Sequence, residues 1–314
     1  MKALVALAAF GLVLAGGACA DEAFVTNQSS DDLSVLDLAA GQPVATIPIG
    51  GRPAGVAVST DGARAYVTSP EGKTLSIVDT AARKVLAQIS VAGGPLGVAV
   101  HPSGKPVYVA DWYNHKIHVV DPDSKSVTAD IQVGLSPSGL AVTPDGKTLL
   151  SADRDSNEVS VVDVATQKRT ARIKVGDRPF GVTIDAKGER AYVANVGTNN
   201  VSVIDLAKRE TVATVPVDER PYAVALVAGK AFVTNQYANS VSVFDLTSFA
   251  KITDIPVGDY PEGIEASTDG ASVYVSNWFA NTLSKIDVAT LKVVKDIPTG
   301  DGPRAFGTFI RKTP

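Results

Sequence analysis

Arginine and aromatic side chains gather around a proline that recurs seven times along the chain. The residues just before these prolines are Arg52, Gly94, Ser136, Arg178, Arg220, Tyr260 and Gly302, and the residues just after them are Ala54, Leu96, Ser138, Phe180, Tyr222, Glu262 and Arg304. Guanidinium groups beside aromatic rings suit an anionic, planar ligand. The alternative is a solvated rim held by local ion pairs, such as Glu262 with Arg304.

One carboxylate stands out at a position that is otherwise small. Glu265 aligns with Ala57, Ala99, Ala141, Thr183, Ala225 and Gly307 in the other copies of the repeat. A carboxylate among small residues needs a partner or a raised pKa. We interpret Glu265 either as a functional acid or base, or as a group paired with a nearby cation or a water in the channel.

Aromatic residues also occur in loops that are polar in other copies of the repeat. These residues are Trp112, Tyr113, Tyr237, Trp278 and Phe279, and they include both tryptophans of the chain. Exposed aromatics at equivalent loop positions predict a surface for a partner protein. The alternative is that each ring covers the top of its own structural unit.

Known catalytic and metal-binding motifs are not found. The three histidines, His101, His115 and His118, are close in sequence but are not expected to converge on a metal. Residues 153–158 begin like a calcium loop, but Glu158 stands where that loop requires glycine. No phosphate loop, nucleophile elbow or zinc-protease motif is present. We therefore predict no catalytic residue, no metal and no cofactor.

Composition and charge narrow the class of protein. The chain has 314 residues, of which 45% are hydrophobic and 20% charged, so it can bury a substantial core. Its formal net charge of −4 makes nucleic acid an unexpected partner.

The first twenty residues differ from the rest. Lys2 precedes an apolar run over residues 3–15, and Ala18 and Ala20 form a small-x-small cleavage site before Asp21. We predict a signal peptide over 1–20, cleaved after Ala20, and a periplasmic or secreted protein. The alternative is a lipoprotein anchored through Cys19, the only cysteine. No other segment resembles a transmembrane span.

The remaining chain is a tandem repeat. A Val/Ile-rich stretch ends in aspartate at Asp37, Asp79, Asp121, Asp163, Asp205, Asp245 and Asp287, with spacings of 42 residues except for one of 40. Thirteen residues before each aspartate lies a motif that reads Phe-Val-Thr-Asn at 24–27, Tyr-Val-Ala-Asn at 192–195 and Tyr-Val-Ser-Asn at 274–277. On these residues the chain resembles the YVTN family of β-propeller repeat proteins, from about residue 22 to residue 310.

Each repeat contains four strand patterns, which we name A to D. In the fifth copy they cover residues 181–184, 191–195, 201–206 and 211–217. Units that bury both faces must stack, and a closed ring leaves no face bare. We predict an all-β, seven-bladed propeller over 21–314, with four antiparallel strands per blade. The chain begins at a strand B and ends with an unpaired strand A, so residues near Phe306 should close the ring against residues near Phe24.

The variable residues belong to the D–A and B–C loops, which lie on one face of a propeller. We expect this D–A/B–C face to bind the ligand or partner. The leading hypothesis is a monomeric, non-enzymatic, exported scaffold that binds a protein partner or an anionic small ligand. The resemblance to quinoprotein propellers implies an alternative, an accessory of a periplasmic oxidoreductase that uses pyrroloquinoline quinone. A third hypothesis is a lyase-like or lactonase-like propeller with a metal in its channel.

Overall fold

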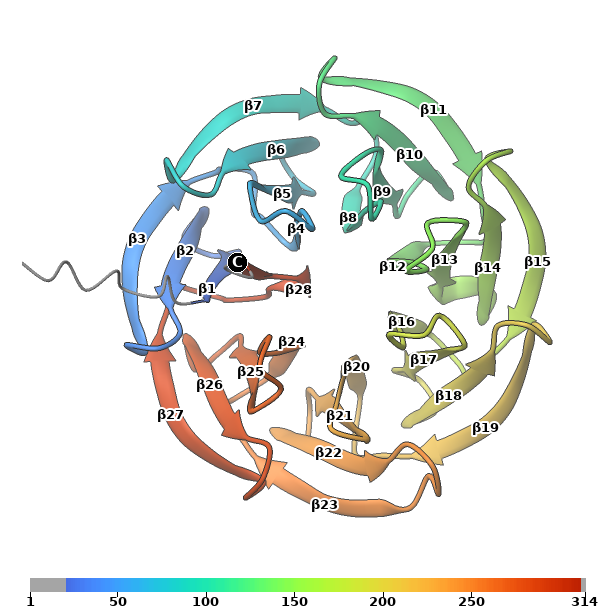
Figure 1. The fold of residues 1–314 in the computed structure, drawn as a ribbon. Helices are drawn as coiled ribbons and strands as arrows, with labels where there is room; N and C mark the ends of the chain where they lie inside the picture. Colours follow the sequence, from blue (N-terminus) through green and yellow to red (C-terminus); the bar gives the residue numbers. More distant parts are fainter. Residues whose placement is uncertain (1–20, 312–314) are drawn as a thin grey trace, which may run out of the picture.

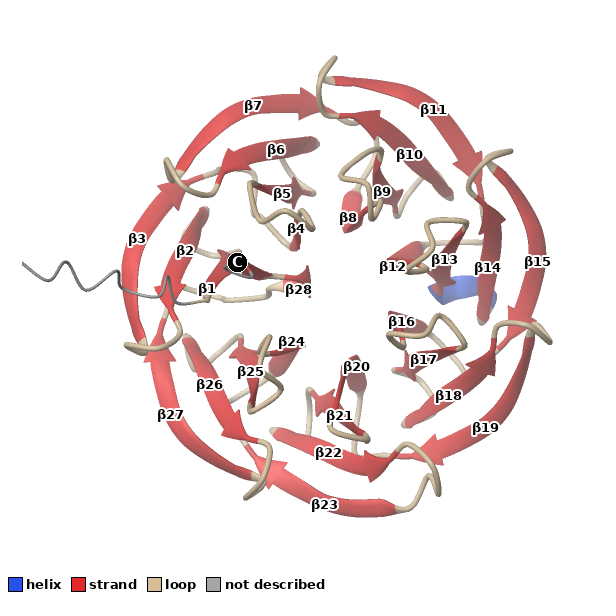
Figure 2. Cartoon of the chain, in the orientation of Figure 1, coloured by secondary structure: helices blue, strands red, loops and turns tan. Residues whose placement is uncertain are grey.

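The protein is a seven-bladed β-propeller, as predicted. A computed structural model describes residues 21–311, and Figures 1 and 2 show their blades arranged around a central axis. Each blade has four antiparallel strands. The predicted signal segment lies outside the described residues. Among the described residues, no helix has the length and apolar character needed to span a membrane.

Four blades follow one another from the N-terminal end, each with its strands in order from the axis outward. The first blade is β29 (Ile310–Arg311), β1 (Glu22–Asn27), β2 (Asp32–Asp37) and β3 (Gln42–Pro48). The second is β4 (Gly55–Val58), β5 (Arg64–Ser69), β6 (Thr74–Asp79) and β7 (Lys84–Ser90). The third is β8 (Pro95–Val100), β9 (Val107–Asp111), β10 (Lys116–Asp121) and β11 (Ser126–Gln132). The fourth is β12 (Pro137–Val142), β13 (Thr148–Asp153), β14 (Glu158–Asp163) and β15 (Lys168–Lys174), with the 3-10 turn η1 (Arg154–Ser156) after β13.

Three further blades complete the ring. The fifth is β16 (Pro179–Ile184), β17 (Arg190–Asn195), β18 (Asn200–Asp205) and β19 (Glu210–Pro216), which confirms the four predicted strands to within two residues at each end. The sixth is β20 (Pro221–Val227), β21 (Lys230–Asn235), β22 (Ser240–Asp245) and β23 (Lys251–Pro256). The seventh is β24 (Pro261–Ala266), β25 (Ser272–Asn277), β26 (Thr282–Asp287) and β27 (Lys292–Pro298).

The repeated four-residue motif holds the blades together. Its aromatic residue is buried, as Tyr192 is with 2% exposure. Its third residue can link two blades, since the Thr26 hydroxyl donates to the carbonyl of Ala54 at 2.8 Å. Its fourth residue acts within the blade, where the Asn27 amide donates to the Ser34 hydroxyl at 2.8 Å. The motif is therefore mainly structural.

The ring is closed by one strand from the C-terminal end beside three from the N-terminal end. Ile310 lies opposite Ala23 in an antiparallel pair, and the Phe24 N–H donates to the Phe309 carbonyl at 2.8 Å. This confirms the predicted closure. Because the outer three strands and the inner strand come from opposite ends of the chain, the first blade depends on both.

Residues on both sides of Phe306 make the predicted contacts near Phe24, since the Arg304 N–H donates to the Thr26 carbonyl at 2.8 Å and Pro303 forms a bridge with Asn27. Phe306 itself belongs to β28 (Phe306–Thr308), which runs parallel to β4 with Phe306 opposite Gly55. Gly307 adopts φ 131°, and a Cβ there would lie 2.2 Å from the Val56 carbonyl oxygen. Only glycine allows this close approach, which draws β28 away from the first blade toward the second.

Candidate functional site

An aromatic plug closes the axis at the D–A/B–C face. Phe180 and Tyr222 follow the repeated proline at the starts of β16 and β20, and Phe306 comes from β28. The centroid of the Phe180 ring lies 4.2 Å from that of Tyr222 and 5.0 Å from that of Phe306. All three side chains are buried, so the two predicted aromatics here pack on each other.

A small pocket lies beside this plug. Its volume is about 250 Å³, and its lining includes Trp112, Tyr113, Phe180 and Arg304. The rings of Trp112 and Phe180 are 6.1 Å apart, and the Arg154 guanidinium lies 5.5 Å from the Trp112 ring centre. Four of the predicted site residues therefore meet in this mouth pocket.

A buried polar network backs the plug. The Arg304 Nε donates to Glu262 Oε2 at 2.6 Å, and its Nη2 donates to the Tyr222 hydroxyl at 2.5 Å. Gln236 Nε2 donates to Glu262 Oε1 at 2.9 Å, and Arg220 Nε donates to Gln236 Oε1 at 2.7 Å. The ion pair between Glu262 and Arg304, which the alternative of a rim held by local pairs predicts, is thus formed.

Burial sets the protonation behaviour of this network. It raises the pKa of Glu262 above its ordinary value, although Arg304 and Gln236 work to lower it. Burial also raises the pKa of the Tyr222 hydroxyl. The pKa of Arg304 is raised: burial alone would lower it, but the Glu262 charge favours the guanidinium. The Arg304 charge is therefore largely compensated by Glu262 inside the protein.

The other predicted arginines do not converge on one point. Arg52 makes an exposed ion pair with Glu71, with 3.2 Å between Nε and Oε1. Arg178 is exposed on a D–A loop. Arg220 is partly buried and stacks on Tyr237, with the guanidinium 4.7 Å from the ring centre. The geometry resembles a rim of local pairs more than one anion-binding ring.

A second aromatic cluster occupies the same face over the sixth and seventh blades. We call Tyr237, Tyr260, Trp278 and Phe279 the aromatic surface. The Tyr260 ring centre lies 5.9 Å from those of Tyr237 and Trp278 and 5.2 Å from that of Phe279. Tyr237 is 55% exposed and Phe279 is 63% exposed. The rings therefore join two blades into one apolar area that remains open to solvent.

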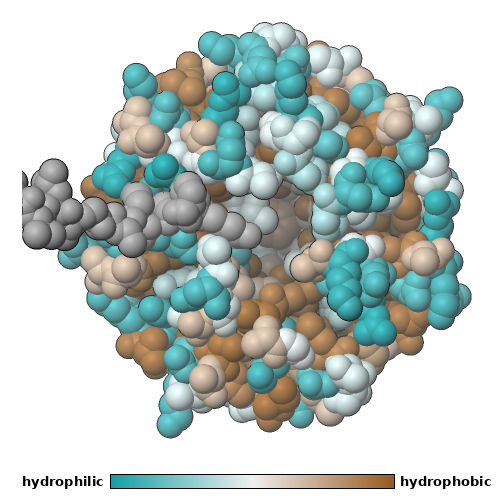
Figure 3. All heavy atoms as spheres, viewed as in Figure 1, coloured by the Kyte–Doolittle hydropathy of each residue, from teal (hydrophilic) through white to brown (hydrophobic). Residues whose placement is uncertain are grey.

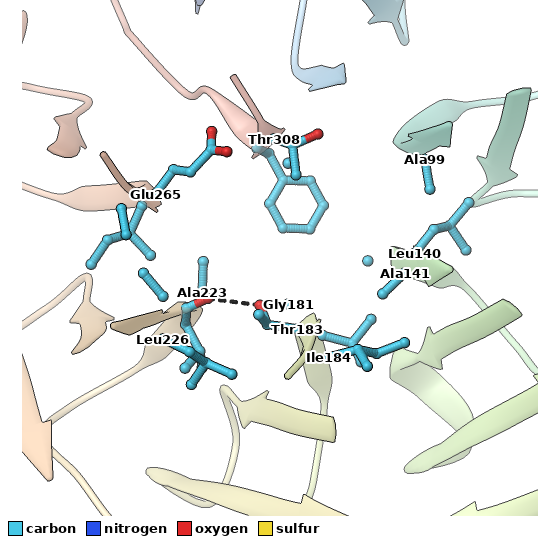
Figure 4. A pocket seen from close by; sticks show the side chains of 18 of the residues that line it. Ala99, Leu140, Ala141, Gly181, Thr183, Ile184, Ala223, Leu226, Glu265 and Thr308 are labelled. Carbon is cyan, nitrogen blue, oxygen red and sulfur yellow. Dashed lines mark hydrogen bonds between the residues drawn. The ribbon is translucent and has the colours of Figure 1, made fainter. Parts of the chain in front are cut away.

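The central channel is a cavity of about 650 Å³ on the opposite side of the plug. Its lining is mostly small and aliphatic, with Ala99, Leu140, Ala141 and Leu226 among the residues drawn in Figure 4. Figure 3 shows one face of the ring, hollowed at the axis. The inner strands β8, β12, β16, β20 and β24 are edge strands of their sheets, so their second edges face this channel.

Glu265 borders the channel and, within residues 21–311, is the only charged residue that lines it. Its Oε2 accepts hydrogen bonds from the N–H groups of Phe309 at 2.5 Å and Ile310 at 2.7 Å. These donors lie where the chain leaves β28 for β29. Glu265 thus supports the closure of the ring, a role that sequence comparison of the repeats could not reveal because the kink itself was not predicted.

Blade three holds a cluster of a buried histidine, a buried aspartate and an exposed aspartate that sequence reasoning missed. His118 Nδ1 lies 2.7 Å from Asp130 Oδ1, and its Nε2 lies 3.1 Å from Asp111 Oδ2. The other two histidines are elsewhere: His101 contacts Ser103, and His115 accepts from the Ser136 N–H. Within residues 21–311, no group of three or more histidine, cysteine or acidic side chains is placed to hold a metal ion.

Comparisons with solved structures agree with the fold. The chain is similar to hydrazine synthase of Kuenenia stuttgartiensis, with 22% identity and a TM-score of 0.72 over 81% of this chain and 88% of that one. It is similar to a protein of unknown function from Desulfotomaculum acetoxidans, with 17% identity and a TM-score of 0.78 over 90% and 99% of the two chains. It is also similar to the dihydro-heme d1 dehydrogenase NirN, with 19% identity and a TM-score of 0.68 over 92% and 66%.

These identities are low, so the similarities to solved structures show the fold alone. No curated protein matches the sequence. The model of the YNCE-like β-propeller family matches residues 14–102 and 107–312, nearly the whole chain. The YVTN assignment within this class stays a prediction. The chain belongs to the YNCE-like β-propeller family.

Proposed function

We propose that this protein is an exported, non-enzymatic scaffold that binds a protein partner on its D–A/B–C face. The aromatic surface supports this function, because four rings in contact form an apolar area in which Tyr237 and Phe279 are each more than half exposed. Exposed aromatic clusters of this kind are typical of partner contacts.

The proposal is tested by site-specific photo-cross-linking in the producing cell. A cross-linking residue replaces Phe279 in one variant and Val294 in a control; Val294 is on β27 of the same blade and is 57% exposed. We expect a discrete cross-linked partner from position 279 only. An excess of the protein without the cross-linking residue should compete for the partner and abolish this cross-link. An excess of the Tyr260→Ala/Phe279→Ala variant should not. Equal competition by that variant contradicts the proposal.

A small planar anion in the mouth pocket is a second candidate function. It is favoured by Arg304 and Trp112, which line the same 250 Å³ pocket. The pocket fits pyrroloquinoline quinone poorly, since three carboxylates would meet one lining arginine whose charge is already shared with Glu262. Trp278→Phe leaves Trp112 as the only tryptophan, so its fluorescence should respond to 2-naphthoate if this site binds anions.

Export is part of the proposal and rests on residues 1–20. The apolar run at 3–15 and the small residues at 18 and 20 support cleavage before Asp21. The intact mass of the protein from the periplasmic fraction tests this. A lipid-modified mass beginning at Cys19 would favour the lipoprotein alternative.

A further inference from the structure

Acidic residues recur beside the aromatic surface at one position of the repeat. The residue two before the repeated proline is acidic in four successive blades, as Asp177, Glu219, Asp259 and Asp301, and it is Gly51, Gly93 or Leu135 in the others. All four acidic residues are exposed. The acidic positions therefore occupy the same side of the ring as the aromatic surface.

Hydrogen bonds tie these acidic loops to the aromatic loops. The Tyr237 N–H donates to the Glu219 carbonyl at 3.4 Å, and the Phe279 N–H donates to the Asp259 carbonyl at 3.2 Å. The carboxylate of Asp259 also accepts from the Asn239 amide at 3.2 Å. The main chain of each residue that carries an exposed ring is thus bonded to the main chain of an exposed acidic residue.

A third acidic residue, Asp301, lies in the next D–A loop, close to Trp278. The Asn281 amide donates to Asp301 at 3.2 Å, and a Cβ on the adjacent Gly302 would lie 2.9 Å from Trp278 Nε1. We call Glu219, Asp259 and Asp301 the acidic rim. Glu219 and Asp259 are bonded through their main chains to the residues that carry the exposed rings, and Asp301 precedes Gly302, which lies beside Trp278.

The rings themselves can accept a cation. Arg220 already places its guanidinium 4.7 Å from the centre of the Tyr237 ring, on a side chain held by Gln236. This single arginine is outnumbered by the three carboxylates of the acidic rim, so the local charge is negative. A nucleic acid or an acidic peptide would be repelled, while a purely apolar segment would leave the rim without a partner.

We propose, building on the function above, that the partner presents an extended basic segment to this surface. Its lysine or arginine stems lie on Tyr260 and Phe279, and their charged ends reach the acidic rim. The aromatic rings supply the apolar contact, and the carboxylates select the charge. This assigns the chemistry of the partner, which the aromatic surface alone leaves open.

The test uses Trp112→Phe, which leaves Trp278 as the only tryptophan and thus a reporter within the aromatic surface. Its fluorescence is titrated with a soluble peptide of alternating lysine and proline, and with matched peptides in which every lysine is replaced by glutamine or glutamate. We expect the lysine peptide to bind about tenfold more tightly than the glutamine peptide at low salt, and the glutamate peptide not to bind. High salt should remove this preference, because these charges are exposed.

Two variants separate charge selection from aromatic contact. In Glu219→Gln/Asp259→Asn, affinity for the lysine peptide should fall severalfold toward that of the glutamine peptide. The matched control is Glu189→Gln/Glu210→Gln, which removes two exposed charges near turns on the other face and should change nothing. Tyr260→Ala/Phe279→Ala should weaken the binding of both the lysine and the glutamine peptide.

The outcomes distinguish this inference from the function on which it rests. Equal affinity for the lysine and glutamine peptides overturns the basic partner, and so does a lysine peptide that fails to saturate the Trp278 signal at low salt. In either case the cross-linking competition at position 279 still decides whether the face binds a partner at all.

Discussion

The third and fourth blades place an aspartate at the same motif position, and the two carboxylates behave in opposite ways. Asp111 ends β9 and Asp153 ends β13, and both are fully buried. The pKa of Asp111 is below its ordinary value. Burial raises the pKa of Asp153 to about 6. The repeat fixes where these side chains lie but not the charge they carry.

The difference comes from the neighbours. Burial would raise the pKa of Asp111 as well, but the Gly94 N–H, Asn114 and His118 together lower it. The described donors to Asp153 are all neutral: the hydroxyls of Ser151 and Ser160 and the Gly134 N–H. Neutral donors only partly offset the loss of water around a charge.

His118 lies among hydrogen-bond acceptors. Its ring nitrogens face only acceptors, which are the carboxylates of Asp111 and Asp130 and, at 3.2 Å from Nε2, the carbonyl of Ala92. Both nitrogens can donate to these acceptors at once only in the imidazolium form. A buried cation between two carboxylates is stable only while its partners remain charged.

The cluster of the third blade also reaches the candidate site. Asp111 Oδ1 accepts from the N–H groups of Gly94, Tyr113 and Asn114, so it holds the loop that brings Trp112 and Tyr113 to the mouth pocket. The fourth blade has no aromatic residue in the equivalent loop. A change at Asp111 should therefore affect both stability and this pocket.

The largest expected effect is the loss of the Asp111 charge. Asp111→Asn leaves the buried His118 with one carboxylate partner instead of two. We expect the free energy of unfolding at pH 7 to fall by roughly 3 kcal/mol, as for other broken buried pairs. Urea unfolding measures this.

The same variant should shift the fluorescence of Trp112, measured in a Trp278→Phe background. A stability within experimental error of the parent protein would mean that the pairing with Asp111 is not needed, and the contrast between the blades would be lost.

The same substitution in the fourth blade should act in the opposite direction. An acid whose pKa is raised on folding stabilises the protein below the ordinary value of 3.8 and loses this stabilisation as the pH rises to about 6. Above pH 6 the charged Asp153 is destabilising. Asp153→Asn should therefore increase the stability at pH 7 by about 2 kcal/mol, less than the full shift implies because hydrogen bonds must rearrange.

The pH profile provides the control for this gain. Between pH 4 and pH 6, the parent protein should lose a component of stability that the Asp153→Asn variant retains. If the difference in stability between the two proteins does not change over this range, the pKa of Asp153 is not raised by burial and the gain in stability has another origin.

The sequence predicted the fold well because the repeat is regular. Seven aspartates and seven prolines kept one register, so strand bounds such as those of β16 to β19 followed directly. The kink of the closing segment was not predicted, because Gly307, with its φ of 131°, departs from the repeat. Phe306 consequently pairs with β4, and Glu265 supports the kink that results.

Side-chain partners were harder to predict than strand positions. The pairing of Glu262 with Arg304 could be proposed because both residues flank the repeated proline on adjacent blades. The link of His118 to Asp111 and Asp130 was not proposed, since it needs the cross-strand register of β9, β10 and β11. A histidine in place of the repeated serine, seven residues after an aspartate, was the signal that could have revealed it.

The smallest expected effect comes from converting the third blade to the common pattern of the repeat. The Asn195 amide donates to the Ser202 hydroxyl at 2.9 Å, and Asn277 with Ser284 does the same at 2.8 Å. Asp111→Asn/His118→Ser would install this neutral pair. It should therefore recover most of the stability lost in Asp111→Asn, leaving a deficit of about 1 kcal/mol for the smaller serine.

This double variant separates charge from shape in the comparison. If a histidine left with Asp130 as its single carboxylate partner is what destabilises Asp111→Asn, removing the histidine must restore stability in urea unfolding. A double variant less stable than Asp111→Asn would instead show that His118 stabilises the blade through its packing and its contact with Asp130. In the restored protein, any remaining shift of Trp112 fluorescence then reports the part of the loop order that needs the Asp111 carboxylate itself.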